Sequence, residues 1–141
     1  MTDPLRLVAI RDVPLDVEEV LAAVGDDAAG GVTLFVGKVR DHDGGKGVTG
    51  LEYSAHPSAL ERLLEVCRAV AGEYDVHALA AVHRIGTLAI GDAAVIVACA
   101  SAHRGVAFDA SRALIDTLKA EVPIWKHQAF SDGTDEWVGT P

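Results

Sequence analysis

The sequence predicts an α+β protein: a single domain in which mixed and antiparallel sheets pack with about three helices. Two observations support this class. Apolar residues recur with a helical period in some segments, and short apolar runs of strand length lie between those segments. The chain has 141 residues, of which 50% are hydrophobic, and this is enough to bury one core. We therefore expect residues 1–141 to form one domain.

The first half of the chain predicts three strands and two helices. Apolar runs indicate strands at Leu5–Ile10, Val32–Val39 and Val48–Ala55, with a glycine-rich loop at Asp41–Gly47. Asp16 and Glu19 form the D-x-x-E start of a helix that ends at Gly25. Pro57 opens the second helix. The apolar face expected of that helix consists of Leu60, Leu63, Leu64, Cys67 and Val70.

The second half predicts a pair of strands, a long helix and further strands. Strands are expected near Ala78–Ile85 and Ala93–Ala100, on either side of a turn at Ala89–Asp92. Pro123 ends the helix that follows, and Ile124–Phe130 is expected to be a strand, before one or two final strands. The buried stripe expected of the helix consists of Phe108, Ser111, Ile115, Leu118 and Val122.

Positive charge is scarce in this chain and gathers around the long helix. The formal net charge is −9, and there are only four lysines. Lys119 lies eleven positions after Phe108, about three helical turns, so it projects over nearly the same face. Its ammonium either reaches out to water along a buried stem or is held in a cleft. Lys126 follows the Pro123 break and can return beside Lys119 on a different element.

His103 and Arg104 lie in the turn between an apolar strand and the long helix. The unpaired amides of a helix N-terminus favour an anion, and an arginine adds bidentate contacts. A polar surface turn is the alternative. The turn has neither a GxxxxGK[ST] nor a GxGxxG pattern, so nothing indicates a nucleotide triphosphate or a dinucleotide.

Lys38 and Arg40 end another predicted strand. Being two residues apart, they face the same side of that strand. From the residues alone a solvated strand end is favoured over a binding site, because most lysines and arginines are simply exposed. His83 and Arg84 lead into a turn, and we expect them to have a structural role.

Four segments together resemble one protein family. FVGKVRDH (35–42), HRIGTLAIGD (83–92), AHRGVAF (102–108) and LKAEVPIWK (118–126) occur in this order. They are similar to motifs of the large, catalytic subunit of molybdopterin synthase. The resemblance spans about residues 30–138, which is most of the chain.

The resemblance implies a fold, a reaction and partners. The fold would be the α/β-hammerhead of that family. The reaction would convert cyclic pyranopterin monophosphate (precursor Z) into molybdopterin by installing two dithiolene sulfurs. The sulfur donor would be a small ubiquitin-like subunit with a C-terminal Gly-Gly thiocarboxylate. Two large subunits would form a central homodimer within a heterotetramer, and the site can borrow residues across the dimer.

The resemblance also implies the site. Lys119 and Lys126 would be catalytic. The expected substrate-binding residues are Lys38, Val39, Arg40, His103, Arg104, His127 and Gln128. In the family the tail after the tryptophan that matches Trp137 runs on and carries a basic residue. Here Val138, Gly139, Thr140 and Pro141 follow, so we expect that contact to be dispensable or the phosphate to be held less tightly.

Composition excludes several other classes. The excess of 21 acidic over 12 basic residues argues against nucleic acid or an anionic membrane as a partner. No apolar run approaches the roughly 20 residues that span a bilayer, and the N-terminus lacks a secretory signal, so a cytoplasmic protein is expected. The six histidines show no ligand spacing, so we expect neither a metal nor a cofactor.

Cys67 and Cys99 lie in apolar segments outside any CxxC motif, and both are expected to be buried, unreactive residues. Any sulfur that is transferred must then arrive on a partner. Two competing functions remain open at this point. One is a non-enzymatic module that captures an acidic or C-terminal peptide tail, and the other is a small phosphate-ester enzyme that needs no protein partner.

Overall fold

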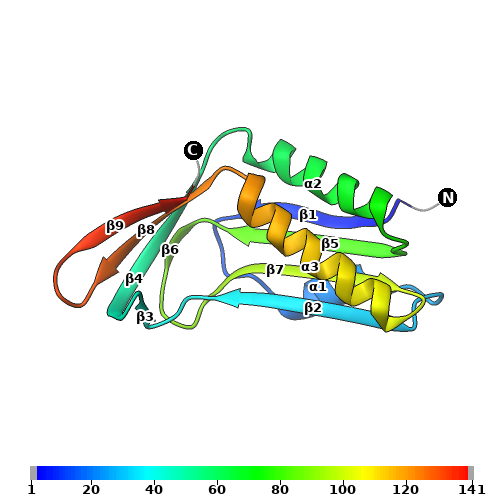
Figure 1. Ribbon diagram of the computed structural model, residues 1–141, viewed down its shortest axis with the longest axis horizontal. Coiled ribbons are helices and arrows are strands. Elements are labelled where there is room, and N and C mark those ends of the chain that lie inside the picture. The colour runs from blue at the N-terminus through cyan, green and yellow to red at the C-terminus, as the bar shows by residue number, and fades with distance from the viewer. Residues whose placement is uncertain (1–2, 140–141) are drawn as a thin grey trace.

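A computed structural model describes residues 3–139 and shows two sheets that meet at the end of a long helix (Figure 1). The three helices are α1 (Val17–Ala23), α2 (Ala59–Glu73) and α3 (Arg104–Glu121). The strands are β1 (Leu5–Arg11), β2 (Gly31–Lys38), β3 (His42–Asp43), β4 (Lys46–Ala55), β5 (Ala78–Arg84), β6 (Gly86–Leu88), β7 (Ala93–Ser101), β8 (Ile124–Phe130) and β9 (Asp135–Gly139).

The first sheet has four strands in the order β1-β5-β7-β2. β1 pairs with β5 in parallel, and the other two pairs are antiparallel. Figure 1 shows α2 and α3 lying together across one face of this sheet. The other face packs against α1 through Val20 and Val24. Because β5 and β7 are covered on both faces, they are apolar throughout rather than alternating.

The second sheet consists of β3, β4, β8 and β9 in that order, with β6 also paired to β4. It projects beyond the C-terminal end of α3, and the long β4 and β8 form its centre (Figure 1). The chain passes from α3 to β8 through Pro123 alone after the helix cap at Val122. The end of α3 is therefore held directly against the junction of the two sheets.

The predicted α+β class with three helices and mixed and antiparallel sheets is confirmed. Every predicted strand is present within two residues of its expected bounds, and β8 has the bounds predicted for it. The short strands β3 and β6 were not predicted. Asp16 caps α1 by accepting from the Glu18 amide, but Glu19 does not complete a capping box, because its carboxylate pairs with Arg11.

The predicted apolar faces of α2 and α3 were each wrong at one residue. Leu60 is 43% exposed and Phe108 is 63% exposed. The buried side of α3 is instead formed mainly by small residues, and it consists of Ala107, Ala110, Ser111, Leu114 and Leu118. The large Phe108 side chain lies outside this buried side and lines the groove beside β2.

Candidate active site

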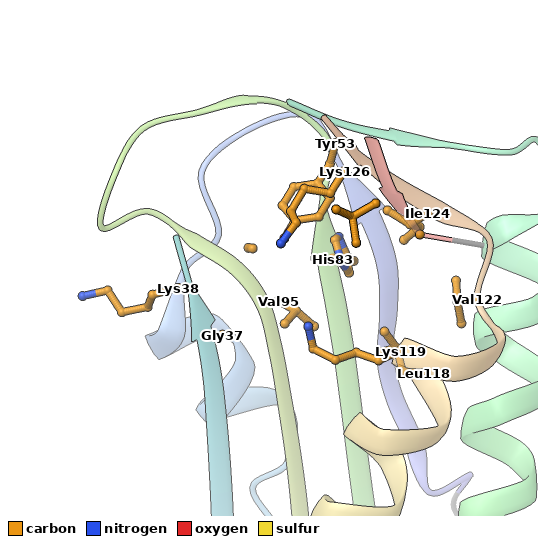
Figure 2. A pocket seen from close by; sticks show the side chains of 13 residues that line it. Gly37, Lys38, Tyr53, His83, Val95, Leu118, Lys119, Val122, Ile124 and Lys126 are labelled. Carbon is orange, nitrogen blue, oxygen red and sulfur yellow. The ribbon is translucent and has the colours of Figure 1, made fainter. Parts of the chain in front are cut away.

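A pocket of about 290 Å³ lies where the C-terminal end of α3 meets both sheets (Figure 2). The ends of β2 and β7 form one wall, and β4, β8 and β9 form the opposite wall. Three of the four lysines of the chain line it: Lys38, Lys119 and Lys126. Among the residues that the structure describes, no carboxylate lines this pocket. The pocket is therefore a cationic one in an acidic protein.

Lys119 and Lys126 face the same pocket from different elements. Lys119 comes from the last turn of α3, and Lys126 comes from β8. Loss of water around the Lys119 ammonium lowers the pKa of that lysine, and the nearby charge of Lys126 lowers it further. An amine with a lowered pKa exchanges protons more readily near neutral pH. The sequence left open whether the Lys119 ammonium reaches out to water or is held in a cleft, and the structure favours the cleft.

Lys38 occupies the rim rather than the interior. It is the last residue of β2 and is exposed. Figure 2 shows its nitrogen directed away from Lys119 and Lys126. Lys38 is therefore placed to meet a group that enters the pocket, not to act at its centre.

Two further lining residues, His83 and Tyr53, were missing from the predicted site. The expectation of a purely structural His83 gave no reason to place it in the pocket, yet it lines the floor. His83 is 7% exposed, and its ring meets the Tyr53 ring edge-on, with centroids 5.0 Å apart. Burial lowers the pKa of His83 to about 4, and the charge of Lys119 acts in the same direction. Burial also raises the pKa of Tyr53.

Val39 and Arg40, both predicted to bind substrate, do not line this pocket. Val39 is 5% exposed, and its backbone is bonded to the turn before β7 through Asp92 and Gly91. Arg40 lies beyond the end of β2, so the alternation of side chains along that strand does not place it on the same side as Lys38. Its guanidinium is 3.6 Å from the carboxylate of Asp43.

His127 and Gln128 also lie outside the pocket. His127 alternates with Lys126 along β8 and stacks on Trp137 with centroids 4.4 Å apart. Its Nε2 is 2.6 Å from Asp135. Gln128 is 2% exposed, and its amide donates to Asp43 and Glu136 at 2.7 Å each.

His103 and Arg104 lie at the opposite end of α3 from Lys119. His103 is the N-cap residue and Arg104 the first residue of the helix, and both are exposed. A helix of 18 residues is about 27 Å long, so neither side chain shares a pocket with Lys119 of the same chain. Gly31, the first residue of β2, packs against them, since a Cβ there would lie 2.8 Å from the Arg104 amide nitrogen.

Comparison with known proteins shows the family. The model of the MoaE protein family matches residues 10–121. Molybdopterin synthase catalytic subunit 1 of Mycobacterium tuberculosis is 47% identical over 131 residues, which cover 92% of this chain and 88% of that protein. This chain belongs to the MoaE protein family.

Solved structures of similar proteins agree with this MoaE assignment. Molybdopterin synthase from Staphylococcus aureus superposes with a TM-score of 0.86 at 32% identity, covering 93% of this chain and 96% of that one. A complex of subunits 1 and 2 of molybdopterin-converting factor from Helicobacter pylori shares the fold, with a TM-score of 0.69 at 23% identity. That likeness covers 98% of this chain and 90% of the other.

The two cysteines of this MoaE chain are buried, as predicted. Cys67 on α2 and Cys99 on β7 are each 0% exposed and free. Burial raises the pKa of Cys67 to about 12 and also raises that of Cys99, so neither is a ready nucleophile. Within residues 3–139 no three His, Cys, Asp or Glu side chains gather as metal ligands, and no helix is long and apolar enough to cross a membrane.

Proposed function

We propose that this chain is the catalytic subunit of a molybdopterin synthase, which converts precursor Z into molybdopterin. The sulfur comes from the C-terminal thiocarboxylate of a small ubiquitin-like partner. The observation that carries the proposal is the convergence of Lys119 and Lys126, from α3 and β8, on one pocket in a chain of the MoaE family. Its relatives carry the name of this enzyme, and the metabolic role assigns the protein to the cytoplasm.

The chemistry of the pocket suits this reaction. A thiocarboxylate is already nucleophilic, so the enzyme needs no thiol of its own, and both cysteines are buried. The incoming tail and the cyclic phosphate of precursor Z are both anions; Lys119 and Lys126 line the space that they would enter, and Lys38 stands at its rim. Release of the phosphate ester and activation of the pterin side chain both require proton transfer. Lys119, with its lowered pKa, is the group we assign to it, and Lys126 is the second.

A second copy of the chain completes this site in our proposal. β2 is an edge strand of its sheet, and three large apolar side chains near its free edge are exposed: Val32 at 50%, Phe35 at 40% and Phe108 at 63%. Thr33, Phe35, Phe108 and Ile115 line a groove between β2 and α3. A long apolar edge of this kind is normally covered in a native assembly. The expected homodimer supplies that cover.

Antiparallel pairing of two β2 strands would bring the dispersed residues together. A two-fold axis places the start of one β2 strand opposite the end of the other. The start is Gly31, which packs against His103 and Arg104. The end is Lys38, at the rim of the pocket. His103 and Arg104 of the second copy would therefore approach the rim and contribute an arginine and a helix N-terminus to phosphate binding.

The proposal is tested by reconstitution. The purified protein is mixed with a thiocarboxylated small subunit and precursor Z, and the dithiolene product is assayed. The proposal expects product only when all three are present. Uptake of the tail without product would instead identify a binding module. Phosphate release without any protein partner would identify a phosphate-ester enzyme.

A further inference from the structure

We propose that His83 contacts the ligand of this pocket directly, through an imidazole Nε2 that accepts a hydrogen bond from an N–H group of that ligand. The pocket then selects ligands that carry an N–H beside an anionic group. This inference deepens the function proposed above and rests on it for the identity of the ligands. A glycine tail has an amide N–H next to its terminal thiocarboxylate, and precursor Z has ring N–H groups besides its cyclic phosphate.

One nitrogen of the His83 ring is already paired within the protein. Nδ1 lies 2.8 Å from the carbonyl oxygen of Arg84. A carbonyl can only accept, so Nδ1 carries the hydrogen, and in the neutral ring Nε2 is left as an acceptor. Burial lowers the pKa of His83 to about 4, and the charge of Lys119 acts in the same direction. The ring is therefore neutral at pH 7.

The other nitrogen is unpaired within the described residues 3–139. His83 is 7% exposed, and its hydrogen bond uses Nδ1, not Nε2. Nε2 is nevertheless absent from the enclosed polar atoms that lack a partner, so an outside group can reach it. His83 comes from β5 and lines the same pocket as Lys119 and Lys126 (Figure 2). The unpaired nitrogen of an almost fully buried residue is therefore accessible from the pocket.

This nitrogen differs in chemistry from the other polar side chains of the described lining, which are Lys38, Lys119, Lys126 and Tyr53. Ammonium groups only donate hydrogen bonds, and a phenol both donates and accepts. Nε2 of His83 is the one side-chain group of this set that only accepts. The lysines can hold the anionic part of a ligand, and His83 can pair with an N–H that the lysines would repel.

The neighbourhood of His83 and Lys119 matches a donor that lies close to an anion. Lys119 is near enough for its charge to act on the His83 ring. In a terminal glycine only one carbon separates the amide nitrogen from the thiocarboxylate. An anion held by Lys119 thus brings an adjacent N–H toward Nε2. A ligand without that N–H would bury Nε2 unpaired, which weakens binding.

A matched pair of variants separates the two ends of the ring. His83→Asn keeps an N–H for the Arg84 carbonyl and removes the acceptor that faces the pocket. His83→Gln places an amide oxygen near the position of Nε2 and gives up the Arg84 contact. A merely structural histidine predicts that His83→Asn is the milder change, whereas a ligand contact predicts that His83→Gln is.

A matched pair of probes tests the tail as the source of the N–H. Acetyl-Gly-Gly and acetyl-Gly-sarcosine both end in a carboxylate, which stands in for the thiocarboxylate, and N-methylation removes the last N–H from the second probe. NMR titration of the full chain measures binding. We expect wild-type protein and His83→Gln to prefer acetyl-Gly-Gly by about 3–10-fold, the effect of one hydrogen bond. His83→Asn should lose this preference.

Precursor Z tests the substrate as the source. If the substrate supplies the N–H, His83→Asn should bind precursor Z about 3–10-fold more weakly than wild-type protein does, and His83→Gln should recover most of the loss. An effect with only one of the two ligand types identifies which of them makes the contact. No effect of His83→Asn with either type overturns the proposal, and so does wild-type protein that binds neither.

Should His83→Asn fail to fold, nitrogen-15 NMR of the wild-type imidazole decides the matter, with His83→Gln giving the assignment. The proposal requires a protonated Nδ1 and a bare Nε2 at pH 7, and an Nε2 signal that shifts when acetyl-Gly-Gly or precursor Z binds. The opposite tautomer, or an Nε2 signal that neither ligand moves, refutes it. Ligands that bind through His83 without dithiolene formation in the reconstituted reaction would refute the proposed function and leave this contact standing.

Discussion

Lys119 and Lys126 line one pocket from two different elements, and the charge of Lys126 lowers the pKa of Lys119. Two cations are held together here without a carboxylate among the described lining residues. Such an arrangement is costly for the free protein, since like charges repel each other. It becomes favourable when an anion enters, and this is the situation expected for a phosphate ester and a thiocarboxylate tail.

Lys119→Ala should lower the rate of dithiolene formation by about 10²–10³-fold, because one cation that stabilises the transition state is lost. The melting temperature should change little, since Lys119 is exposed and makes no ion pair within residues 3–139. Lys46→Ala is the matched control. Lys46 pairs with Asp132 away from the pocket, so turnover should be retained. Near-normal turnover of folded Lys119→Ala would exclude this assignment.

Lys126→Gln should raise the pKa of Lys119, because a neighbouring positive charge is removed while the partial loss of water around the ammonium remains. Since a higher pKa keeps Lys119 protonated to higher pH, any limb of the pH–rate profile due to its deprotonation should move upward. Lysine carbon-13 NMR measures the shift directly. No upward movement would show that the two ammonium groups are not coupled.

Mixing two inactive variants should restore activity if the site is shared between copies. Lys119→Ala and Arg104→Ala are each expected to be nearly inactive as homodimers. A mixed dimer would hold one intact site, built from Lys119 of one chain and Arg104 of the other. After random exchange of subunits, about one quarter of the wild-type activity should appear. If Arg104 served Lys119 of its own chain, no mixture could recover activity.

Replacing both cysteines, Cys67→Ser and Cys99→Ser, should leave turnover per folded molecule unchanged. The free energy of unfolding should fall by about 1–3 kcal/mol, because two hydroxyl groups are buried where thiols lay. Denaturant titration measures the stability, and mass spectrometry during turnover reports sulfur on the protein. A persulfide on either wild-type cysteine would contradict the prediction.

The buried His83 should make the protein less stable in mild acid. Its pKa is about 4 in the folded chain and about 6.5 in an unfolded one. Between these values the unfolded state binds more protons, so stability falls as pH decreases from about 6.5 to about 4, and no further loss arises from this group below that. The total loss is about 3 kcal/mol. His83→Gln should show a flatter dependence over this window in urea titrations. Equal slopes for both proteins would disprove it.

Most helices and strands were predictable from the sequence. The spacing of apolar residues indicates α3 and β8, and Pro123 marks the boundary between them. Which side of α3 is buried was not predictable. Nothing in the sequence distinguishes Ala107 and Ala110 from exposed alanines. Only the structure shows that they are buried and that Phe108 is not.

The site was predictable only where its residues lie close to the proline that ends α3. Lys119 and Lys126 flank Pro123, and local geometry alone turns them toward the same space. His83 gave no comparable signal, because a strand covered on both faces has no alternation to show which side a residue takes. Arg104 lies a full helix away from Lys119, and the second copy that would bring it back cannot be inferred from periodicity.

The short connection between α3 and β8 makes the pocket sensitive to chain length. Side chains alternate along β8, so Lys126 faces the pocket while His127 stacks on Trp137. Insertion of one residue after Pro123 would move Lys126 to the position of His127 and present the indole of Trp125 where the ammonium belongs. A change of length is easier to accommodate in the turn between β3 and β4, where a Cβ added at Gly44 or Gly45 would meet no atom within 4 Å. Between Lys119 and Lys126, the number of residues determines which side chain faces the pocket.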